Sequence, residues 1–431
     1  MFTHKLLKRR VIASAVALGV TAALGACSSS TNNSPAVPED TAAKTPATGP
    51  EVDVWTIAAT GGVAAAPQPG AGVKAAARYM NDHGGIGSNH QKVVVKSCDT
   101  QFTPQGEIQC AQQAADDPQA IAVVAPQDVL AVQQFTTVLQ NAGLPSVGGI
   151  PVAPSDFTNP INFPLVTTNF GAAACAVLTA KATKASTVGF ATVDIPAAVD
   201  VTNDGVAAAK HAGINTTGPV TFPVTTTDVT PFVSQVSEKG ADAVVLAAAS
   251  QGTGAWLAAA ARLGKSKPTC VIDGTVPNQV LGGLGNQAKD FYAASFLPDV
   301  SWTGYPMLDK FRQQAQAENS EDQAASLDAS NNTELVMLGW AAMQAVQQGA
   351  ANVGGALTRS DFLAALNNTT VKIGDGDTAL LPPVDFSKPN SNPKYSRLFN
   401  AKYFLKKWDV TKQAFVQVQG ADTLHADELV P

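Results

Sequence analysis

The chain has 431 residues, with 28 Lys and Arg against 34 Asp and Glu, which gives a formal net charge of −6. Only 14% of the residues are charged, and an acidic chain of low charge density lacks the basic face that nucleic acid requires, so we expect no nucleic-acid partner. The length exceeds that of one ordinary core and favours two lobes.

The N-terminus has the pattern of a bacterial export signal. Residues 1–10 hold four basic residues and no acidic one, and the 14 uncharged residues 11–24 follow. This stretch is too short to span a bilayer comfortably but has the length of a signal-peptide core. It leads into Leu24-Gly25-Ala26-Cys27, which resembles the bacterial lipobox. We therefore expect residues 1–26 to be a lipoprotein signal peptide that is cleaved before Cys27.

By this resemblance, Cys27 would carry the acyl chains and anchor the protein to the extracytoplasmic face of the cell membrane. Several acyl chains together give a lasting attachment, which a single chain does not. The alternative is an ordinary secretory signal with a chance cysteine. The small residues before Cys27 and the serines after it favour the anchor.

Residues 27–50 predict a flexible tether. They contain almost no bulky apolar side chain, so they cannot bury enough surface to offset the entropy of ordering. No later apolar run is long enough to span a membrane, and we expect the remainder to be soluble. Without residues 1–26, the basic residues fall to 24 and the formal charge becomes −10.

Four cysteines remain beyond Cys27, and an even number outside the cytoplasm favours disulfides. Cys98 ends a strand-like run and Cys110 should lie in the next helix, which favours a Cys98–Cys110 disulfide. Cys175–Cys270 follows by elimination, with two buried free thiols as an equally weighted alternative. No C-x-x-C spacing or nearby His pair indicates a metal.

From Val52 onward, strand-like apolar runs alternate with helix-length segments. The first series predicts strands at 52–58, 93–95, 120–125 and 145–148, with helices at about 73–80, from Pro104 and at 129–141. Thr103 and Pro104 form a natural cap and first-turn pair. The β-α-β-α order predicts a mainly parallel sheet.

A second series of similar size suggests a second, similar lobe. It predicts strands at 187–191, 219–222, 243–248 and 269–272, and helices at 172–181, 199–211, 230–239 and 253–263. The last third predicts helices at 306–319, 333–348 and 360–366, a Gly-rich segment at 349–355, and strands near 401–405 and 415–418.

Several short stretches then resemble one family. Residues 79–87 read Tyr-Met-Asn-Asp-His-Gly-Gly-Ile-Gly, and the strand 93–95 and Cys98-Asp99 follow. Farther along the chain come 142–147, 239–245 and 261–264, which read Ala-Gly-Leu-Pro-Ser-Val, Lys-Gly-Ala-Asp-Ala-Val-Val and Ala-Arg-Leu-Gly. Their collinear order resembles the leucine/isoleucine/valine-binding family of periplasmic-type binding proteins, over about residues 52–420.

The resemblance implies an α/β fold of the type 1 periplasmic binding protein class. Two Rossmann-like lobes with parallel sheets would be joined by three hinge crossovers and would bind the ligand between them. Carried onto this chain, lobe I is 51–166 plus 297–350, lobe II is 167–296 plus 351–420, and 421–431 is a C-terminal tail. The crossovers would fall near 165–167, 296–298 and 349–355, and such connections permit closure by hinge rotation.

Ligands of open parallel α/β sheets lie beyond the carboxyl ends of the strands. Here that rule, together with the family alignment, selects as ligand-binding candidates Thr60, Gly61, Gln127, Asp128, Gly149, Ile150, Asp194, Ser250, Gln251, Asp273 and Thr275. Taken singly, each is better explained as a loop cap or turn residue. Taken together, they outline one cleft.

By the same resemblance, the family's amino-acid binders hold the ligand carboxylate with hydroxyl and backbone N–H groups, and its ammonium with acidic residues and an aromatic group. This chain has residues 126–129, Pro-Gln-Asp-Val, in place of a serine-rich loop, and 149–151, Gly-Ile-Pro, in place of Ala-x-Thr. These departures weaken the case for an α-amino acid. We expect a neutral or weakly charged polar organic ligand, with aliphatic amides and amino acids as the main candidates.

The resemblance implies a monomeric solute-binding lipoprotein that delivers a small molecule to the permease of an ABC importer. A ligand-sensing receptor of the same fold is the alternative, and a non-binding surface lipoprotein is a further one. We expect neither an enzyme nor a cofactor. Residues 263–266, Leu-Gly-Lys-Ser, lack the earlier glycine of a phosphate-binding loop, and none of the five histidines lies at a predicted strand end.

Overall fold

The structure is a computed structural model that describes residues 37, 39–62, 65–167, 170–400 and 402–418. The expected signal peptide, the lipidation site Cys27 and the tail 421–431 lie outside the described residues. All described residues belong to one compact unit, Ser34–Pro431.

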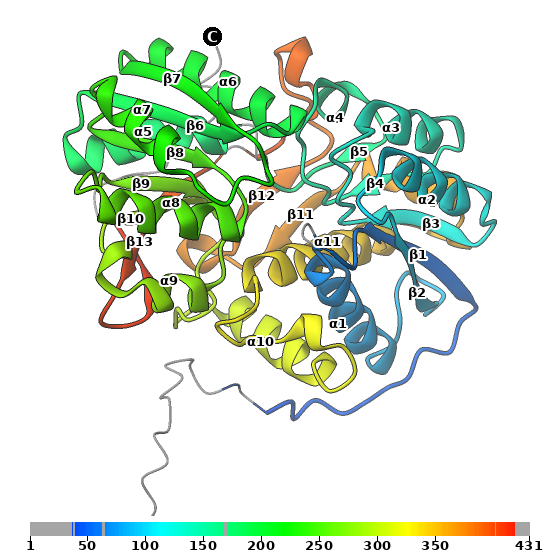
Figure 1. Cartoon of the computed structure of the whole chain (residues 1–431). Coiled ribbons are helices and arrows are strands. Elements are labelled where there is room, and N and C mark those ends of the chain that lie inside the picture. Colours follow the sequence, from blue (N-terminus) through cyan, green and yellow to red (C-terminus); the bar gives the residue numbers. More distant parts are fainter. Residues whose placement is uncertain (1–36, 38, 63–64, 168–169, 401, 419–431) are drawn as a thin grey trace, which may run out of the picture. The chain divides into compact units, whose positions relative to one another are not determined.

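The first sheet is parallel throughout, as the β-α-β-α pattern predicts (Figure 1). Its strand order is β2-β1-β3-β4-β5, with bounds β1 Glu51–Ala58, β2 Lys92–Asp99, β3 Ala120–Val124, β4 Ser146–Val147 and β5 Asn162–Phe163. The helices between these strands are α1 Gln68–Asp82, α2 Pro104–Asp116, α3 Val132–Asn141 and α4 Pro154–Thr158.

The second sheet has seven strands in the order β14-β13-β10-β9-β8-β6-β7. Its strands are β6 Thr187–Val193, β7 Asn215–Phe222, β8 Ala243–Ala247, β9 Thr269–Ile272, β10 Phe291–Ser295, β13 Phe404–Asp409 and β14 Ala414–Gln417. The strands β6 to β10 are parallel to their neighbours, whereas β13 pairs antiparallel with β10 and with β14. The helices of this series are α5 Gly171–Thr183, α6 Pro196–His211, α7 Thr230–Glu238, α8 Ser250–Arg262 and α9 Asn278–Leu284.

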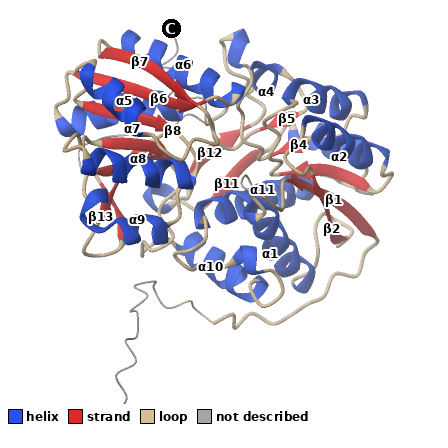
Figure 2. Cartoon of the chain, viewed as in Figure 1, coloured by secondary structure: helices blue, strands red, loops and turns tan. Residues whose placement is uncertain are grey.

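The remaining elements follow β10 in the sequence, and Figure 2 labels α10, α11, β11 and β12 among them. They are α10 Pro306–Glu318, α11 Thr333–Ala351, α12 Arg359–Leu366 and the antiparallel pair β11 Thr370–Ile373 and β12 Leu381–Asp385. Short 3-10 helices are Gly285–Ala288, Gln323–Ala325, Gly376–Thr378 and Pro393–Tyr395.

The second sheet is buried on both faces. On β8, Ala243 and Val245 belong to the core that contains α5 and α6, while Val244 and Leu246 belong to the core that contains α7 and α8. A parallel strand in such a layer reads as a continuous apolar run, which is how residues 243–248 could be recognised in the sequence.

Local signals set several helix boundaries. The hydroxyl of Thr103 accepts a hydrogen bond from the Gly106 N–H at 3.0 Å, and Pro104 is the first residue of α2, as the capping pattern predicts.

Helices α1 and α11 pack backbone to backbone. A Cβ on Gly72 would overlap the carbonyl oxygen of Val336, and a Cβ on Gly339 would overlap that of Pro69.

Both expected disulfides are confirmed. Cys98–Cys110 joins β2 to α2, and its Cα atoms are 5.7 Å apart. Cys175–Cys270 joins α5 to β9 across 95 residues of sequence, with Cα atoms 5.6 Å apart. The alternative of two free buried thiols at Cys175 and Cys270 is therefore ruled out in this structure.

Residues 45–49, which the sequence places in the tether, are hydrogen-bonded to the folded chain. The N–H of Thr45 donates to the carbonyl oxygen of Asp82, and the N–H of Ala47 to that of Asn81, both at 2.7 Å. These bonds join backbone to backbone, so the composition of the segment gave no sign of them.

The lobe boundaries inferred from the sequence stay a prediction, and the contacts favour one change. The third crossover was expected at 349–355, but α12 packs against α11 and β3. Arg359 on α12 donates to the carbonyl oxygens of Asp117 at 2.5 Å and Ala120 at 3.0 Å. We therefore propose that lobe I extends to about residue 400, because the chain joins the second sheet only at β13.

This proposal puts the third crossover beside the first. The side-chain amide of Asn400 donates to the carbonyl oxygen of Leu165 at 3.0 Å, and the hydroxyls of Thr167 and Tyr403 are 3.0 Å apart. The glycines of 349–355 mark the end of α11, and that is why they look like a connection in the sequence.

Candidate functional site

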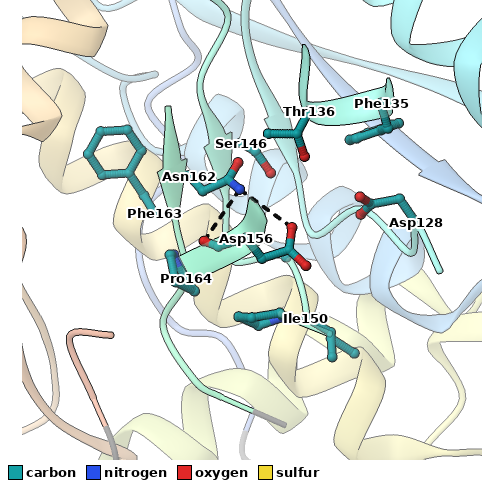
Figure 3. Close-up of a pocket in the computed structure, with 11 residues that line it drawn as sticks. Asp128, Phe135, Thr136, Ser146, Ile150, Asp156, Asn162, Phe163 and Pro164 are labelled. Carbon is teal, nitrogen blue, oxygen red and sulfur yellow. Dashed lines mark hydrogen bonds between the residues drawn. The ribbon is translucent and has the colours of Figure 1, made fainter. Parts of the chain in front are cut away.

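A small polar pocket lies where the carboxyl ends of β3 and β4 meet (Figure 3). The loops after these strands, α3, α4 and β5 complete it. Its volume is about 10 Å³, which is close to the least that holds one water molecule. The lining residues are Asp128, Phe135, Thr136, Ser146, Gly149, Ile150, Pro151, Asp156, Asn162, Phe163 and Pro164.

Asp156 is held in place by the backbone around it. One carboxylate oxygen accepts the N–H groups of Val152 and Ala153 at 2.9 and 3.0 Å, which caps the first turn of α4. The other oxygen is 3.5 Å from the side-chain amide of Asn162. Burial raises the pKa of Asp156 to about 6, against the lowering effect of the two N–H groups.

Glu107, on α2, is a buried carboxylate with a structural role. It accepts the N–H groups of Val129, Leu130 and Ala131 at distances between 2.7 and 3.1 Å, and so fixes the β3–α3 loop. Burial raises its pKa, and these bonds oppose the rise. The loop that carries Asp128 is thus positioned by a side chain outside the pocket.

Asp128 has no comparable support. It is 7% exposed, and no hydrogen bond or ion pair from another described residue reaches its carboxylate. Burial raises the pKa of Asp128 well above its ordinary range, and the neighbouring charges of Asp156 and Glu107 raise it further. Figure 3 shows its carboxylate directed into the space that Asp156 also faces.

The pocket gathers only some of the candidates that the sequence selects. Asp128, Gly149 and Ile150 line it. Thr60, Gly61 and Gln127 follow strands of the same sheet but are not among its lining residues. Thr60 and Gly61 are exposed, and the Thr60 N–H donates to the carboxylate of Asp99 at 3.0 Å.

The candidates after the strands of the second sheet lie outside the pocket, and their described bonds are local. Asp194 is exposed and accepts the Val224 N–H at 2.8 Å, and the hydroxyl of Thr275 donates to the carbonyl oxygen of Ile272 at 2.9 Å. Ser250 and Gln251 begin α8.

Asp273 is paired within the chain. Its carboxylate forms an ion pair with Lys406, which is fully buried on β13. Lys406 is also 3.3 Å from a carboxylate oxygen of Glu334 in the first turn of α11, whose other oxygen accepts from Ser295 at 3.2 Å. Burial raises the pKa of Glu334 well above its ordinary range, and the charge of Asp273 adds to the rise. This cluster joins α11 to the second sheet.

Sequence reasoning missed four polar residues of the pocket, namely Thr136, Ser146, Asp156 and Asn162. The strand-end rule selects residues that follow a strand, whereas Thr136 lies within α3, Ser146 within β4 and Asn162 within β5. The Ala-Pro-Ser-Asp run at 153–156 is a helix-start signal that could have drawn attention to Asp156.

A second hollow, of about 410 Å³, lies between the β7–α7 loop and α8. Its charged residues are the largely exposed Asp228 and Arg262, whose closest atoms are 4.0 Å apart. Such an exposed pair contributes little binding energy.

Within the described ranges, no helix is both long and apolar enough to cross a bilayer. The same part of the chain contains no group of three or more His, Cys, Asp or Glu side chains placed to hold a metal ion.

Two α/β sheets in one chain, with a polar pocket at the carboxyl ends of the strands, define a two-lobed ligand-binding protein. The chain belongs to the periplasmic binding protein family, whose model matches residues 55–399. The resemblance and the fold class inferred from the sequence are thereby confirmed. The family is one of binding proteins and not of enzymes.

Solved structures support the fold. A substrate-binding periplasmic protein from Ralstonia solanacearum is 18% identical with a TM-score of 0.70, covering 84% of this chain and 99% of its own. A fatty acid ABC transporter substrate-binding protein from Thermomonospora curvata is 16% identical with a TM-score of 0.69, covering 90% and 97%. A possible leucine/isoleucine/valine-binding protein from Rhodopirellula baltica SH 1 is 15% identical with a TM-score of 0.67, covering 90% and 100%. No curated protein matches the chain.

Proposed function

We propose that this protein is the extracytoplasmic solute-binding lipoprotein of an ABC importer, and that it captures a small polar organic ligand between its lobes. The observation that carries this proposal is the polar pocket at the carboxyl ends of β3 and β4, within a family of binding proteins. In open α/β sheets that edge is where ligands bind.

The pocket also bears on the kind of ligand. Structural relatives include a fatty acid carrier and a possible leucine/isoleucine/valine-binding protein, so the fold alone does not select a ligand class. Here Asp128, Thr136 and Ser146 place polar atoms at the pocket, which Phe135 and Phe163 also line. A long apolar chain would leave these buried polar groups without hydrogen bonds, which is costly.

Lipid anchoring and coupling to a permease are part of the same proposal. The basic start, the 14 uncharged residues and Leu24-Gly25-Ala26-Cys27 support the anchor at Cys27. The two-lobed fold and the paired crossovers near 165–167 and 400–403 support closure by hinge rotation, the change that a permease would recognise.

The test is to denature the purified protein and identify the small molecules that it releases by mass spectrometry. A stoichiometric polar metabolite that raises the melting temperature when added back would support the proposal. An empty protein with no thermal shift across a broad metabolite panel would contradict it.

An uptake assay in cells distinguishes a transport protein from a ligand-sensing receptor of the same fold. Cells that lack the protein should fail to import the identified metabolite if the protein serves transport. Unchanged import, with loss of a transcriptional or behavioural response to the metabolite, would favour the receptor.

A further inference from the structure

Three polar side chains face the pocket without a partner among the described residues. Asp128 is 7% exposed, Ser146 is 7% exposed and Thr136 is 2% exposed, and each lines the pocket. No described residue forms a hydrogen bond with the carboxylate of Asp128 or with the hydroxyls of Thr136 and Ser146. More than nine-tenths of each residue is buried, and buried polar groups are nearly always hydrogen-bonded.

These groups and their neighbour Asp156 are mainly acceptors. A carboxylate accepts only, and a hydroxyl can accept as well as donate. Asp156 has already used one carboxylate oxygen on two backbone N–H groups, while its other oxygen has the 3.5 Å contact with Asn162. A group that donates several hydrogen bonds therefore complements the pocket better than one that accepts them.

Among the described residues, no cation forms an ion pair with these carboxylates. Arg397 is the buried cation behind β5, and its Nε donates to the carbonyl oxygen of Asn162 at 2.6 Å. Its guanidinium lies over the ring of Phe163, 4.3 Å from the ring centre, and no ion pair joins it to Asp128 or Asp156. A cation bound in the pocket would stabilise the ionised form of Asp128, which burial and the neighbouring carboxylates otherwise disfavour.

The volume of the pocket favours an ammonium over a guanidinium. A volume of about 10 Å³ suits a group as small as a water molecule. An ammonium is a compact charge with three rotatable donors, whereas a guanidinium is a planar fork that needs more room.

We propose that Asp128, Thr136 and Ser146 form the subsite for a primary ammonium group of the ligand, with Asp156 as a second carboxylate beside it. The proposal rests on the proposed function, because it names the substrate class of the same pocket: organic molecules with a primary ammonium at one end. A ligand carboxylate is excluded from this subsite, since like charges placed together inside a protein are strongly disfavoured.

The test uses three probes of similar size and different charge: n-butylammonium chloride, butyramide and sodium butyrate. Each is titrated into the purified protein at constant ionic strength, up to about 50 mM, which covers the millimolar Kd expected of a small fragment. We expect heat and a rise in melting temperature with n-butylammonium only.

The variant that tests the assignment is Asp128→Asn, which removes the charge and keeps the shape. It should weaken n-butylammonium binding at least about tenfold, the loss typical of a hydrogen bond to a charged group. Asp116→Asn is the matched control, because Asp116 is exposed at the end of α2. The Asp116→Asn variant should bind n-butylammonium with the affinity of the wild type. If Asp128→Asn does not fold, Thr136→Val provides the same comparison with a smaller loss.

Each of the other outcomes would contradict the assignment of this subsite to an ammonium group. Equal binding of butyramide and n-butylammonium, with no effect of Asp128→Asn, would indicate a neutral amide site. Binding of butyrate would indicate an anion site, and no binding of n-butylammonium would reject the assignment. The proposed function survives all three if a released metabolite without an ammonium still stabilises the protein, so the two failures are distinguishable.

Discussion

Asp156 combines a structural bond with an unusual proton affinity. Its carboxylate caps α4, and burial nevertheless raises its pKa to about 6. A carboxyl whose pKa is higher in the folded state keeps a proton that the unfolded chain has lost. Between the pKa of this carboxyl in the unfolded chain and its pKa in the folded protein, the free energy of unfolding falls as the pH rises.

The first prediction concerns this slope. Between about pH 4 and about pH 6, Asp156 should lower the free energy of unfolding by about 2 to 3 kcal/mol, and Asp156→Asn should remove that decline. Asparagine still offers an oxygen to the cap. Urea unfolding of both proteins across this range measures the difference. A decline of equal size in Asp156→Asn would show that the carboxyl titrates normally.

Lys406 is a second buried ionisable group, and its protonation state depends on its partners. Burial lowers the pKa of Lys406, but the carboxylates of Asp273 and Glu334 outweigh burial and raise it. The ammonium therefore stays charged, and each carboxylate depends on it.

The second prediction is that Lys406→Met costs about 3 to 5 kcal/mol at neutral pH, because it leaves two buried carboxylates without a cation. The cost should shrink as the pH falls, because burial and the charge of Asp273 raise the pKa of Glu334, which therefore takes up a proton more readily. The neighbouring Lys407, whose ion pair with Asp290 is partly exposed, is the control, and Lys407→Met should cost less than about 1 kcal/mol. Equal losses in the two variants would contradict a special role for Lys406.

At the scale of elements, the contact of α1 with α11 depends on glycine. Gly72 and Gly339 let the two helices approach until backbone meets backbone, with no room for a Cβ on either side. The first turn of α11 carries Glu334, which contacts Lys406 of the second sheet. A shift of α11 would therefore disturb both the core of the first sheet and the contact between Glu334 and Lys406.

The third prediction is that Gly339→Ala destabilises the protein by about 1 to 3 kcal/mol or more, despite the higher helix propensity of alanine. Gly283→Ala in α9 is the matched helical control, because a Cβ there meets nothing within 4 Å, and it should be neutral or slightly stabilising. Thermal unfolding followed by circular dichroism compares the two. A neutral Gly339→Ala would mean that the helices can separate at no cost.

At the scale of the whole molecule, attachment and ligand capture are separate properties. The proposed anchor lies at Cys27, and the pocket lies beyond residue 127. Among the described residues of the segment before β1, Lys44 forms an ion pair with Asp82 at the end of α1, and the N–H of Thr45 donates to the carbonyl oxygen of the same residue.

The fourth prediction follows from this separation. Cys27→Ala should abolish acylation and release the protein from the membrane fraction, because several acyl chains are needed for lasting attachment. The melting temperature of the folded domain should not change. Membrane fractionation and mass spectrometry of the N-terminal peptide are the measurements. A Cys27→Ala variant that stays membrane-bound would point to an uncleaved signal instead of a lipid anchor.

Sequence by itself determined the order and kind of most elements. Apolar runs such as 243–248 and 269–272 predicted buried parallel strands, and Thr103-Pro104 predicted the start of α2, because these signals depend on residues close together in the chain. The Cys98–Cys110 disulfide was also predicted, whereas the sequence left Cys175–Cys270 open against two free thiols. The strand β10 and the pair β11–β12 were missed, since their short runs carry no distinct period.

Only the tertiary structure decided which candidates act together. Asp128, Gly149 and Ile150 meet at one pocket with Thr136, Ser146 and Asp156, which come from separate elements. Asp273, equally well placed at a strand end, is instead paired with Lys406, 133 positions later. The physical reason is that charge balance and burial depend on neighbours in space, and local sequence patterns do not specify which residues those neighbours will be.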